Sequence, residues 1–211
     1  TICREWGYKG IKLDFWSLQF EIPAVRFQNE NQTAIELRNL FLKDMRDVVP
    51  EDGYIIACCV TNKGNPFVGQ YVDGARASTD IGDGTPRTVS AAACGLTASS
   101  PFFRHDCLLA DADSIGWNPD LRAGENRLWA TCALLSGQIC EIGGDLPSLS
   151  SEARAFLKTV VDLAGPAKRT RNGISGAGID RLPARHLVRE GEDAVLEGYL
   201  NWHQRPRAIH I

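Results

Sequence analysis

The chain lacks the features that mark several large classes of protein. None of its apolar runs approaches the roughly 20 residues that a membrane-spanning helix needs. Its formal net charge of −3 gives no reason to expect nucleic acid or an anionic membrane surface as a partner. The glycine patterns of phosphate-binding and dinucleotide-binding loops are absent as well. We therefore expect no membrane partner, no nucleic acid and no cofactor.

The seven cysteines form neither a metal-ligand pattern nor a complete disulfide framework. No Cys/His cluster has zinc spacing, an odd number of thiols cannot all pair within one chain, and the adjacent Cys58 and Cys59 fall in an expected strand. Asp111-Ala112-Asp113 begins like a calcium loop, but Ile115 and Arg122 stand where further ligands are needed. We therefore expect no metal and mostly buried, reduced thiols, which favours a cytoplasmic location without fixing it.

What the chain does contain is a regular alternation of strand and helix patterns. Strands are expected at 9–16, 54–60, 75–81, 102–106 and 137–142, with an acidic loop around Asp111 and Asp113. Helices are expected at 32–48, 86–98 and 125–135, and from Ser148 or Ser150 to Gly165. The apolar stripe expected on the first of these helices consists of Leu37, Leu40, Phe41, Met45 and Val48. This alternation predicts an α/β protein with a parallel sheet and crossover helices.

The first expected strand has two unlike faces. Ile11, Leu13 and Phe15 form an apolar face, and the other face carries Lys12 and Asp14. A strand in an ordinary parallel sheet is buried on both faces. One charged face therefore suits a (β/α) barrel strand whose inner face ends, at its carboxyl end, in a polar pocket. A half-exposed strand with solvated charges fits the local pattern equally well.

The strand expected at 75–81 ends in a similar way. Arg76, Ser78 and Asp80 share one face, and Asp80 falls at the carboxyl end, two strands along from Asp14. Paired carboxylates at a barrel mouth suit glycoside cleavage, in which one attacks the anomeric carbon and the other protonates the leaving oxygen. The residues alone also fit, and by themselves favour, a plainer role in which Asp80 pairs with Arg76 or caps the following helix.

Five short motifs, in the right order, resemble those of the α-galactosidase (melibiase) superfamily of retaining glycosidases. They are Lys12–Phe15, Arg76–Asp80, His105–Leu109, the Ser-Gly and Asp-Leu pairs within Leu135–Leu146, and Tyr199–Trp202. The resemblance implies that residues 1–166 are about strands four to eight of a (β/α)8 TIM barrel. It implies that residues 167–211 are a linker and the beginning of an antiparallel C-terminal β-sandwich domain.

The resemblance also implies a double-displacement cleavage of terminal α-galactosides, whether simple galactosides or oligosaccharides. Asp14 would be the nucleophile and Asp80 the acid/base. The side chains implied to bind the substrate are Lys12, Arg76 and Cys59, with Cys58 competing for the place of Cys59. Ile81-Gly82-Asp83-Gly84 departs from the family pattern after the acid/base, which leaves the sugar specificity open.

Strands four to eight alone would leave a sheet edge and apolar helix faces open. We therefore expect one of two kinds of function. Either the chain is part of a glycoside hydrolase whose remaining strands lie in the same protein or in another chain, since Thr1 and Ile211 both look like cuts in a longer protein. Or it is a non-catalytic half-barrel that acts in assembly or in carbohydrate binding. A homo-oligomer is compatible with both.

Overall fold

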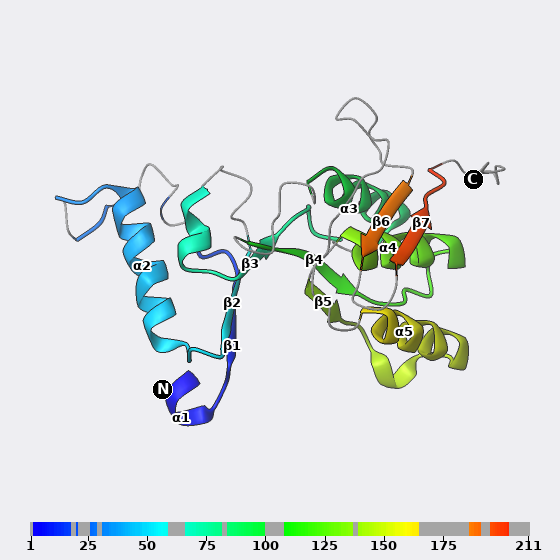
Figure 1. Cartoon of the computed structure of the whole chain (residues 1–211), viewed down its shortest axis with the longest axis horizontal. Coiled ribbons are helices and arrows are strands. Elements are labelled where there is room, and N and C mark those ends of the chain that lie inside the picture. Colours follow the sequence, from blue (N-terminus) through cyan, green and yellow to red (C-terminus); the bar gives the residue numbers. More distant parts are fainter. Residues whose placement is uncertain are drawn as a thin grey trace. The chain divides into compact units, whose positions relative to one another are not determined.

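The computed structural model describes residues 2–17, 20, 26–28, 31–58, 66–81, 84–99, 108–136, 139–164, 186–190 and 195–202. This part is mixed α/β, with a parallel five-stranded sheet in the order β1-β2-β3-β4-β5 and an antiparallel pair, β6-β7 (Figure 1). The predicted α/β class with a parallel sheet is thereby confirmed, and parallel strands that follow one another in chain order are compatible with part of a (β/α)8 barrel. The chain forms two compact units: unit 1 is Thr1–Arg76 with Asp106–Leu109, and unit 2 is Ala77–His105 with Ala110–Ile211.

Unit 1 is built on three neighbouring parallel strands. Its elements are α1 (Ile2–Trp6), β1 (Gly10–Leu13), α2 (Ala34–Val48), β2 (Tyr54–Ala57), the 3-10 helix η3 (Pro66–Gln70) and β3 (Gly74–Arg76). The register pairs Lys12 with Ile56, and Ile56 with Gly74. Arg46 Nη1 and the Ile55 amide both donate to Asp73 Oδ2, at 2.8 and 2.7 Å, and these bonds fasten α2 and β2 to the entry of β3.

Helix α2 confirms the predicted helix, but its buried face differs from the predicted stripe. Thr33 and Glu36 form a capping box, with the Glu36 amide donating to Thr33 Oγ1 at 3.2 Å and the Thr33 amide donating to Glu36 Oε2 at 2.7 Å. Leu42 is the buried residue of the helix at 0% exposure, whereas Leu40 is 44% exposed. Apolar residues cover much of the circumference of this helix, so periodicity alone did not show which flank faces inward.

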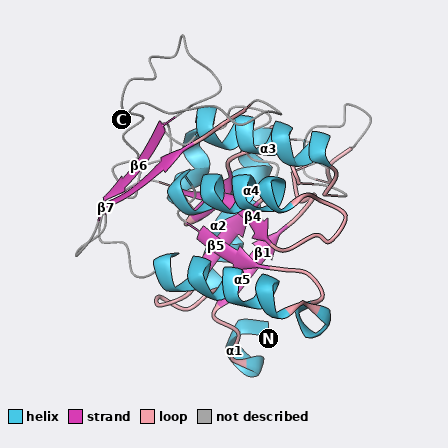
Figure 2. Ribbon diagram, turned by 90° about the vertical axis from the view of Figure 1, so that its right-hand side faces the viewer, coloured by secondary structure: helices cyan, strands magenta, loops and turns pink. Residues whose placement is uncertain are grey.

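Unit 2 holds the remaining helices and most of the last strands of the sheet. Its elements are α3 (Pro86–Ser99), β4 (Leu109–Ile115), α4 (Ala123–Ser136), β5 (Ile139–Ile142), the 3-10 helix η5 (Leu146–Ser148), α5 (Ser151–Ala164), β6 (His186–Glu190) and β7 (Val195–Tyr199) (Figure 2). The three predicted helices are confirmed. Ser150, rather than Ser148, caps α5, because the Ala153 amide donates to Ser150 Oγ at 3.2 Å.

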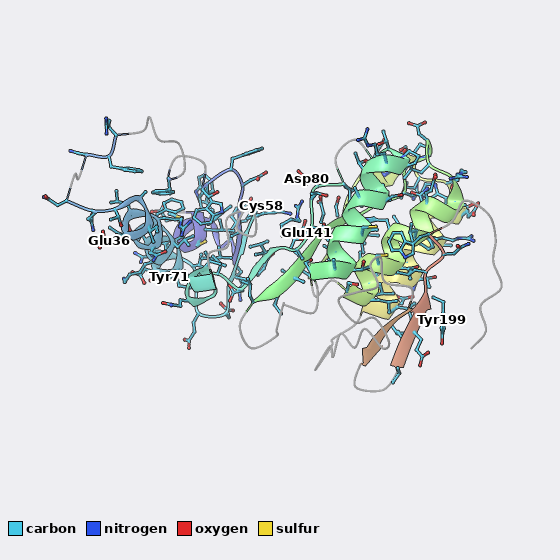
Figure 3. The ribbon with its side chains drawn as sticks, turned by 90° about the horizontal axis from the view of Figure 1, so that it is seen from above. Glu36, Cys58, Tyr71, Asp80, Glu141 and Tyr199 are labelled. Atoms are coloured by element: carbon cyan, nitrogen blue, oxygen red, sulfur yellow. The ribbon has the colours of Figure 1, made fainter. Side chains whose placement is uncertain are left out.

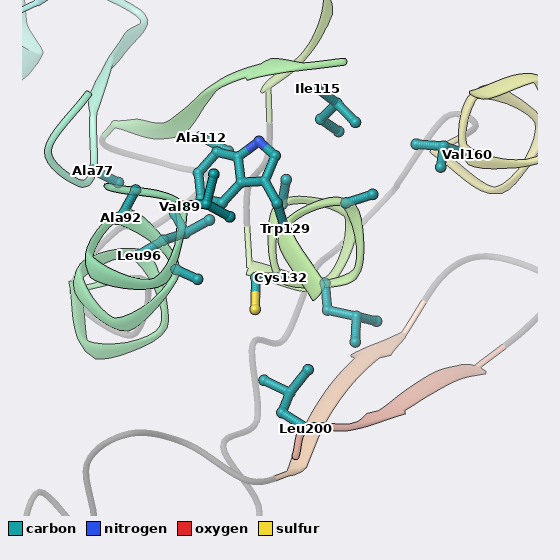
Figure 4. Packing of buried hydrophobic residues seen from close by; sticks show 14 of the residues in the cluster. Ala77, Val89, Ala92, Leu96, Ala112, Ile115, Trp129, Cys132, Val160 and Leu200 are labelled. Carbon is teal, nitrogen blue, oxygen red and sulfur yellow. The ribbon is translucent and has the colours of Figure 1, made fainter. Parts of the chain in front are cut away.

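The core of unit 2 lies between α3, α4 and β4. Figure 4 shows Leu96, Ile115, Trp129 and Cys132 within it, all at most 3% exposed. The indole nitrogen of Trp129 donates to the Ser114 carbonyl at 3.0 Å, so this buried polar atom is satisfied. The core therefore packs β4 directly onto α4.

The C-terminal hairpin packs on this unit as well. A Cβ on Gly198 of β7 would clash with the end of the Leu135 side chain of α4, so the hairpin packs closely on this helix. Leu200, which follows β7, is a buried member of the core. The described part of 167–211 thus consists of this hairpin and the residues directly after it. The predicted linker and residues 203–211 lie outside the described residues, and the β-sandwich domain stays a prediction.

Two predictions about strands are wrong in detail. β3 ends at Arg76, so Ser78 and Asp80 lie beyond the strand and do not share its face. Asp111 and Asp113, which we expected in a loop, belong to β4. They fit a strand because hydrogen bonds from backbone amides satisfy their carboxylates. The strand expected at 102–106 lies outside the described residues.

The buried face of α2 is tested by two leucine truncations. Leu42→Ala should lower the free energy of unfolding by about 2–5 kcal/mol, because it leaves a cavity at a fully buried site. Leu40→Ala on the same helix is the matched control and should cost less than about 0.5 kcal/mol. Equilibrium urea unfolding, followed by tryptophan fluorescence, measures both. If both variants lowered the free energy of unfolding equally, Leu40 would be as buried as Leu42, as the predicted stripe requires.

Candidate functional site

Three residues of the candidate site stand at the carboxyl ends of the strands of unit 1. By the parallel register, Asp14 directly after β1 stands at the level of Cys58 after β2 and of Arg76 at the end of β3. The Cys58 amide donates to the Leu13 carbonyl at 2.8 Å, so the ladder between the first two strands continues to this level. Lys12 lies in β1 two residues before Asp14, the spacing of side chains on one strand face.

Arg76 and Cys58 touch each other inside unit 1. Arg76 Nη2 lies 3.9 Å from Cys58 Sγ, and the two residues are only 9% and 5% exposed. Of the two adjacent cysteines, the structure therefore places Cys58 beside Arg76 (Figure 3 labels Cys58). Cys59 lies outside the described residues, so its predicted contact with the sugar stays a prediction.

The chain turns sharply directly after Asp14. Phe15 has a left-handed φ of 50°, and its amide donates to Asp14 Oδ1 at 2.9 Å. Phe15 is 66% exposed, so its predicted place on the apolar strand face is wrong. Trp16 is buried instead, with Nε1 donating to the Cys58 carbonyl at 2.8 Å and its ring stacked on Phe41 at 6.1 Å between centroids. These contacts fix the turn that presents Asp14.

Lys12 and Asp14 are both exposed. A polar barrel pocket and a solvated half-exposed strand would each give this exposure. The structure of unit 1 therefore fits both interpretations that the sequence allowed.

Asp80 lies in unit 2, four residues after the end of β3, and its side chain is exposed (Figure 3). The next residue, Ile81, donates its amide to Asp113 Oδ2 at 3.2 Å. Thr85 directly precedes helix α3, and its Oγ1 accepts from the Thr88 amide at 3.4 Å. The capping side chain that the structure shows for this helix is therefore that of Thr85, five residues after Asp80.

Sequence reasoning missed two buried carboxylates on β4. Asp111 is 0% exposed and Asp113 is 9% exposed. Asp111 Oδ1 accepts from the Asp113 amide at 2.8 Å, and Asp113 Oδ1 accepts from the Ser114 amide at 2.7 Å. The alternation of Ala110 and Ala112 with these aspartates is the strand signal that would have placed them.

Within the described ranges, no three His, Cys, Asp or Glu side chains come together as metal ligands. In that same part of the chain, no helix combines the length and the apolar character needed to cross a bilayer. No protein-family model matches this chain, and no curated protein matches it. The resemblance to the α-galactosidase superfamily therefore rests on the short motifs alone and stays a prediction.

The left-handed turn after Asp14 is tested by substituting Phe15. Asn tolerates a positive φ, whereas a β-branched residue does not. Phe15→Asn should keep the free energy of unfolding within about 0.5 kcal/mol, and Phe15→Val should lower it by about 1–3 kcal/mol. The phenyl ring is exposed, so both variants lose little packing. Urea unfolding measures the stability of both variants. A Val variant as stable as the Asn variant would contradict the left-handed conformation at position 15.

Proposed function

We propose that this chain carries catalytic residues of a retaining glycoside hydrolase that acts on terminal α-galactosides. The observation that carries the proposal is the position of Asp14, directly after a parallel strand and level with Cys58 and Arg76. Catalytic residues of (β/α)8 barrels stand at the carboxyl ends of the strands. The five motifs that resemble the α-galactosidase superfamily support the reaction class.

In this proposal Asp14 attacks the anomeric carbon. Its Oδ1 accepts the Phe15 amide, so Oδ2 is the oxygen that we expect to form the bond to the sugar. Lys12, on the same strand face, binds sugar hydroxyls. Arg76 and one cysteine complete the part of the site that recognises the sugar. That cysteine is either Cys58, which lies beside Arg76, or Cys59, which the motif implies.

Two displacements account for the reaction. In the first, the bond from Asp14 to the anomeric carbon forms as the glycosidic bond breaks, and the proton of Asp80 passes to the leaving oxygen. In the second, water attacks the same carbon, Asp80 takes a proton from that water, and the Asp14 carboxylate leaves. The mechanism requires the two carboxyl groups to come within about 5–5.5 Å of each other in the working enzyme.

The proposal includes further strands beside β1, from the same protein or another chain. β1 is an end strand of the described sheet. Trp6, Tyr8 and Phe15, which precede and follow it, are 69%, 59% and 66% exposed. Exposed apolar side chains at an open edge are unfavourable unless another surface covers them. We therefore expect residues 1–211 alone to turn over an aryl α-galactoside far more slowly than the complete barrel, and full activity of the purified chain would contradict this.

The same exposed aromatic side chains favour a second candidate function. A non-catalytic module that assembles with a partner or binds carbohydrate would also present such a surface. This function requires neither Asp14 nor Asp80 to be ionisable. Binding of α-galactosides that survives both Asp14→Asn and Asp80→Asn, in a protein with no measurable hydrolysis, would support it over the hydrolase.

The roles of the two aspartates are tested by chemical rescue in the complete protein. Asp14→Gly should abolish turnover of an aryl α-galactoside, and added azide should enter from the vacated face and give the β-galactosyl azide. Asp80→Ala should keep the first step for substrates with good leaving groups. Azide should then attack the covalent intermediate and give the α-galactosyl azide. Proton NMR of the anomeric signal distinguishes the two products.

The control is Asp120→Ala, which removes an exposed carboxylate elsewhere on unit 2. It should hydrolyse the substrate like the unaltered protein and form no azide product. If both active-site variants gave the same anomer, the assignment of nucleophile and acid/base would be wrong. If the unaltered protein did not hydrolyse the substrate at all, the reaction class itself would fail.

A further inference from the structure

The backbone around Asp80 is held from both sides by β4. At one end the Ala77 amide donates to the Asp111 carbonyl at 2.9 Å. At the other end the Ile81 amide donates to Asp113 Oδ2 at 3.2 Å. Asp80 lies between these anchors, next to the second, with its side chain exposed. A short segment fixed at both ends orients the side chain that it carries, although that side chain itself is open to solvent.

Asp113, which accepts the hydrogen bond from Ile81, has an unusual backbone conformation. Its φ is 72°, in the left-handed region, although it is only 9% exposed. The register with β5 shifts here, because Asp111 pairs with Ile139 and Ser114 pairs with Glu141. Between these two pairs β4 advances by three residues and β5 by two. β4 therefore contains one extra residue, a β-bulge, and a bulge changes the direction of a side chain. Strained residues of this kind persist where the surroundings over-determine them, often at functional sites.

Both carboxylate oxygens of Asp113 accept backbone amides. Oδ1 accepts from Ser114 at 2.7 Å and Oδ2 accepts from Ile81 at 3.2 Å. The Asp113 amide in turn donates to the fully buried Asp111 at 2.8 Å. The hydrogen bond to Asp111 therefore fixes the backbone of Asp113, and the Asp113 carboxylate in turn fixes the Ile81 amide. An amide side chain could not serve in the same way, because it has only one oxygen to offer to two donors.

We propose that Asp113 is a positioning residue for Asp80, acting through the Ile81 amide. This inference rests on the proposed function, in which Asp80 is the general acid of the first displacement. A general acid must lie within hydrogen-bond reach of the leaving oxygen, and a misplacement of about 1 Å can cost about a hundredfold in rate. Asp113 constrains the backbone that carries Asp80, because it accepts the hydrogen bond from the next amide along the chain.

A purely structural role for Asp113 gives a different expectation. If its carboxylate only stabilised the bulge of β4, its loss would lower the stability of unit 2 and the rates for all substrates together. A positioning role affects acid assistance selectively. Substrates whose leaving group needs a proton would then lose rate, whereas those whose leaving group departs as a stable anion would not.

The test is Asp113→Asn in the complete protein. Asn tolerates the left-handed backbone and can still accept from the Ser114 amide, but its NH2 group then faces the Ile81 amide. For phenyl α-galactoside, kcat/KM should fall about a hundredfold. For 2,4-dinitrophenyl α-galactoside it should fall less than about tenfold, because little acid assistance is needed. Asp162→Asn makes the same change of charge at an exposed position on α5 and should affect neither substrate.

A second measurement uses residues 1–211 and does not depend on activity. Amide hydrogen exchange at Ile81 should be faster in Asp113→Asn by about tenfold or more, since the amide loses its acceptor. Unchanged Ile81 exchange would overturn the proposed tether. Unchanged rates on both substrates would do the same.

The kinetic outcomes separate this inference from the proposed function. If Asp80→Ala is selective for the leaving group but Asp113→Asn slows both substrates equally, in step with a lower Tm, Asp113 is structural and the hydrolase assignment stands. If the unaltered protein cleaves neither substrate, the proposed function fails, and the role of Asp113 in positioning a general acid fails with it.

Discussion

The parallel register of β1, β2 and β3 is the constraint on which the candidate site of unit 1 depends. The hydrogen bond from the Cys58 amide to the Leu13 carbonyl, 2.8 Å long, extends that register to the level of Asp14. A slip by one residue would move Asp14 to the opposite face of the sheet. Trp16 opposes such a slip, because its buried indole donates to the carbonyl of the same Cys58. The position of the predicted nucleophile thus follows from backbone pairing and one buried aromatic ring.

Beyond the ends of the strands, some backbone amides donate to aspartate carboxylates instead of to a neighbouring strand. Asp14 accepts from Phe15 in unit 1, and Asp113 accepts from Ile81 in unit 2. Among the described residues, the non-glycine residues with positive φ are Phe15 and Asp113. One directly follows the predicted nucleophile, and the other holds the residue after the predicted acid/base. Left-handed strain is uncommon outside glycine and often marks functional sites, so its occurrence at these positions is consistent with the proposed roles.

Sequence patterns predicted the elements of this chain better than their exact faces and ends. The alternation of strand and helix signals led to the parallel sheet, because that pattern depends on many residues at once. The inward face of α2 depended on tertiary packing at Leu42, which periodicity does not show. The burial of Asp111 and Asp113 was missed because acidic residues suggest a loop unless their hydrogen-bond partners are known. The positions of Lys12, Asp14 and Arg76 followed from period-two alternation, whereas no sequence signal distinguished Cys58 from Cys59.

The central claim is that Asp14 is the nucleophile of a retaining α-galactosidase-like reaction. It is tested most directly by incubating the complete protein with a galactose-configured cyclitol aziridine, which alkylates the nucleophile of a retaining enzyme. Peptide mass mapping should find one equivalent of label, on Asp14, with activity lost in proportion. Galactose should slow the labelling, and Asp14→Gly should take up none. Stoichiometric label on another carboxylate, or undiminished labelling of Asp14→Gly, would contradict the account.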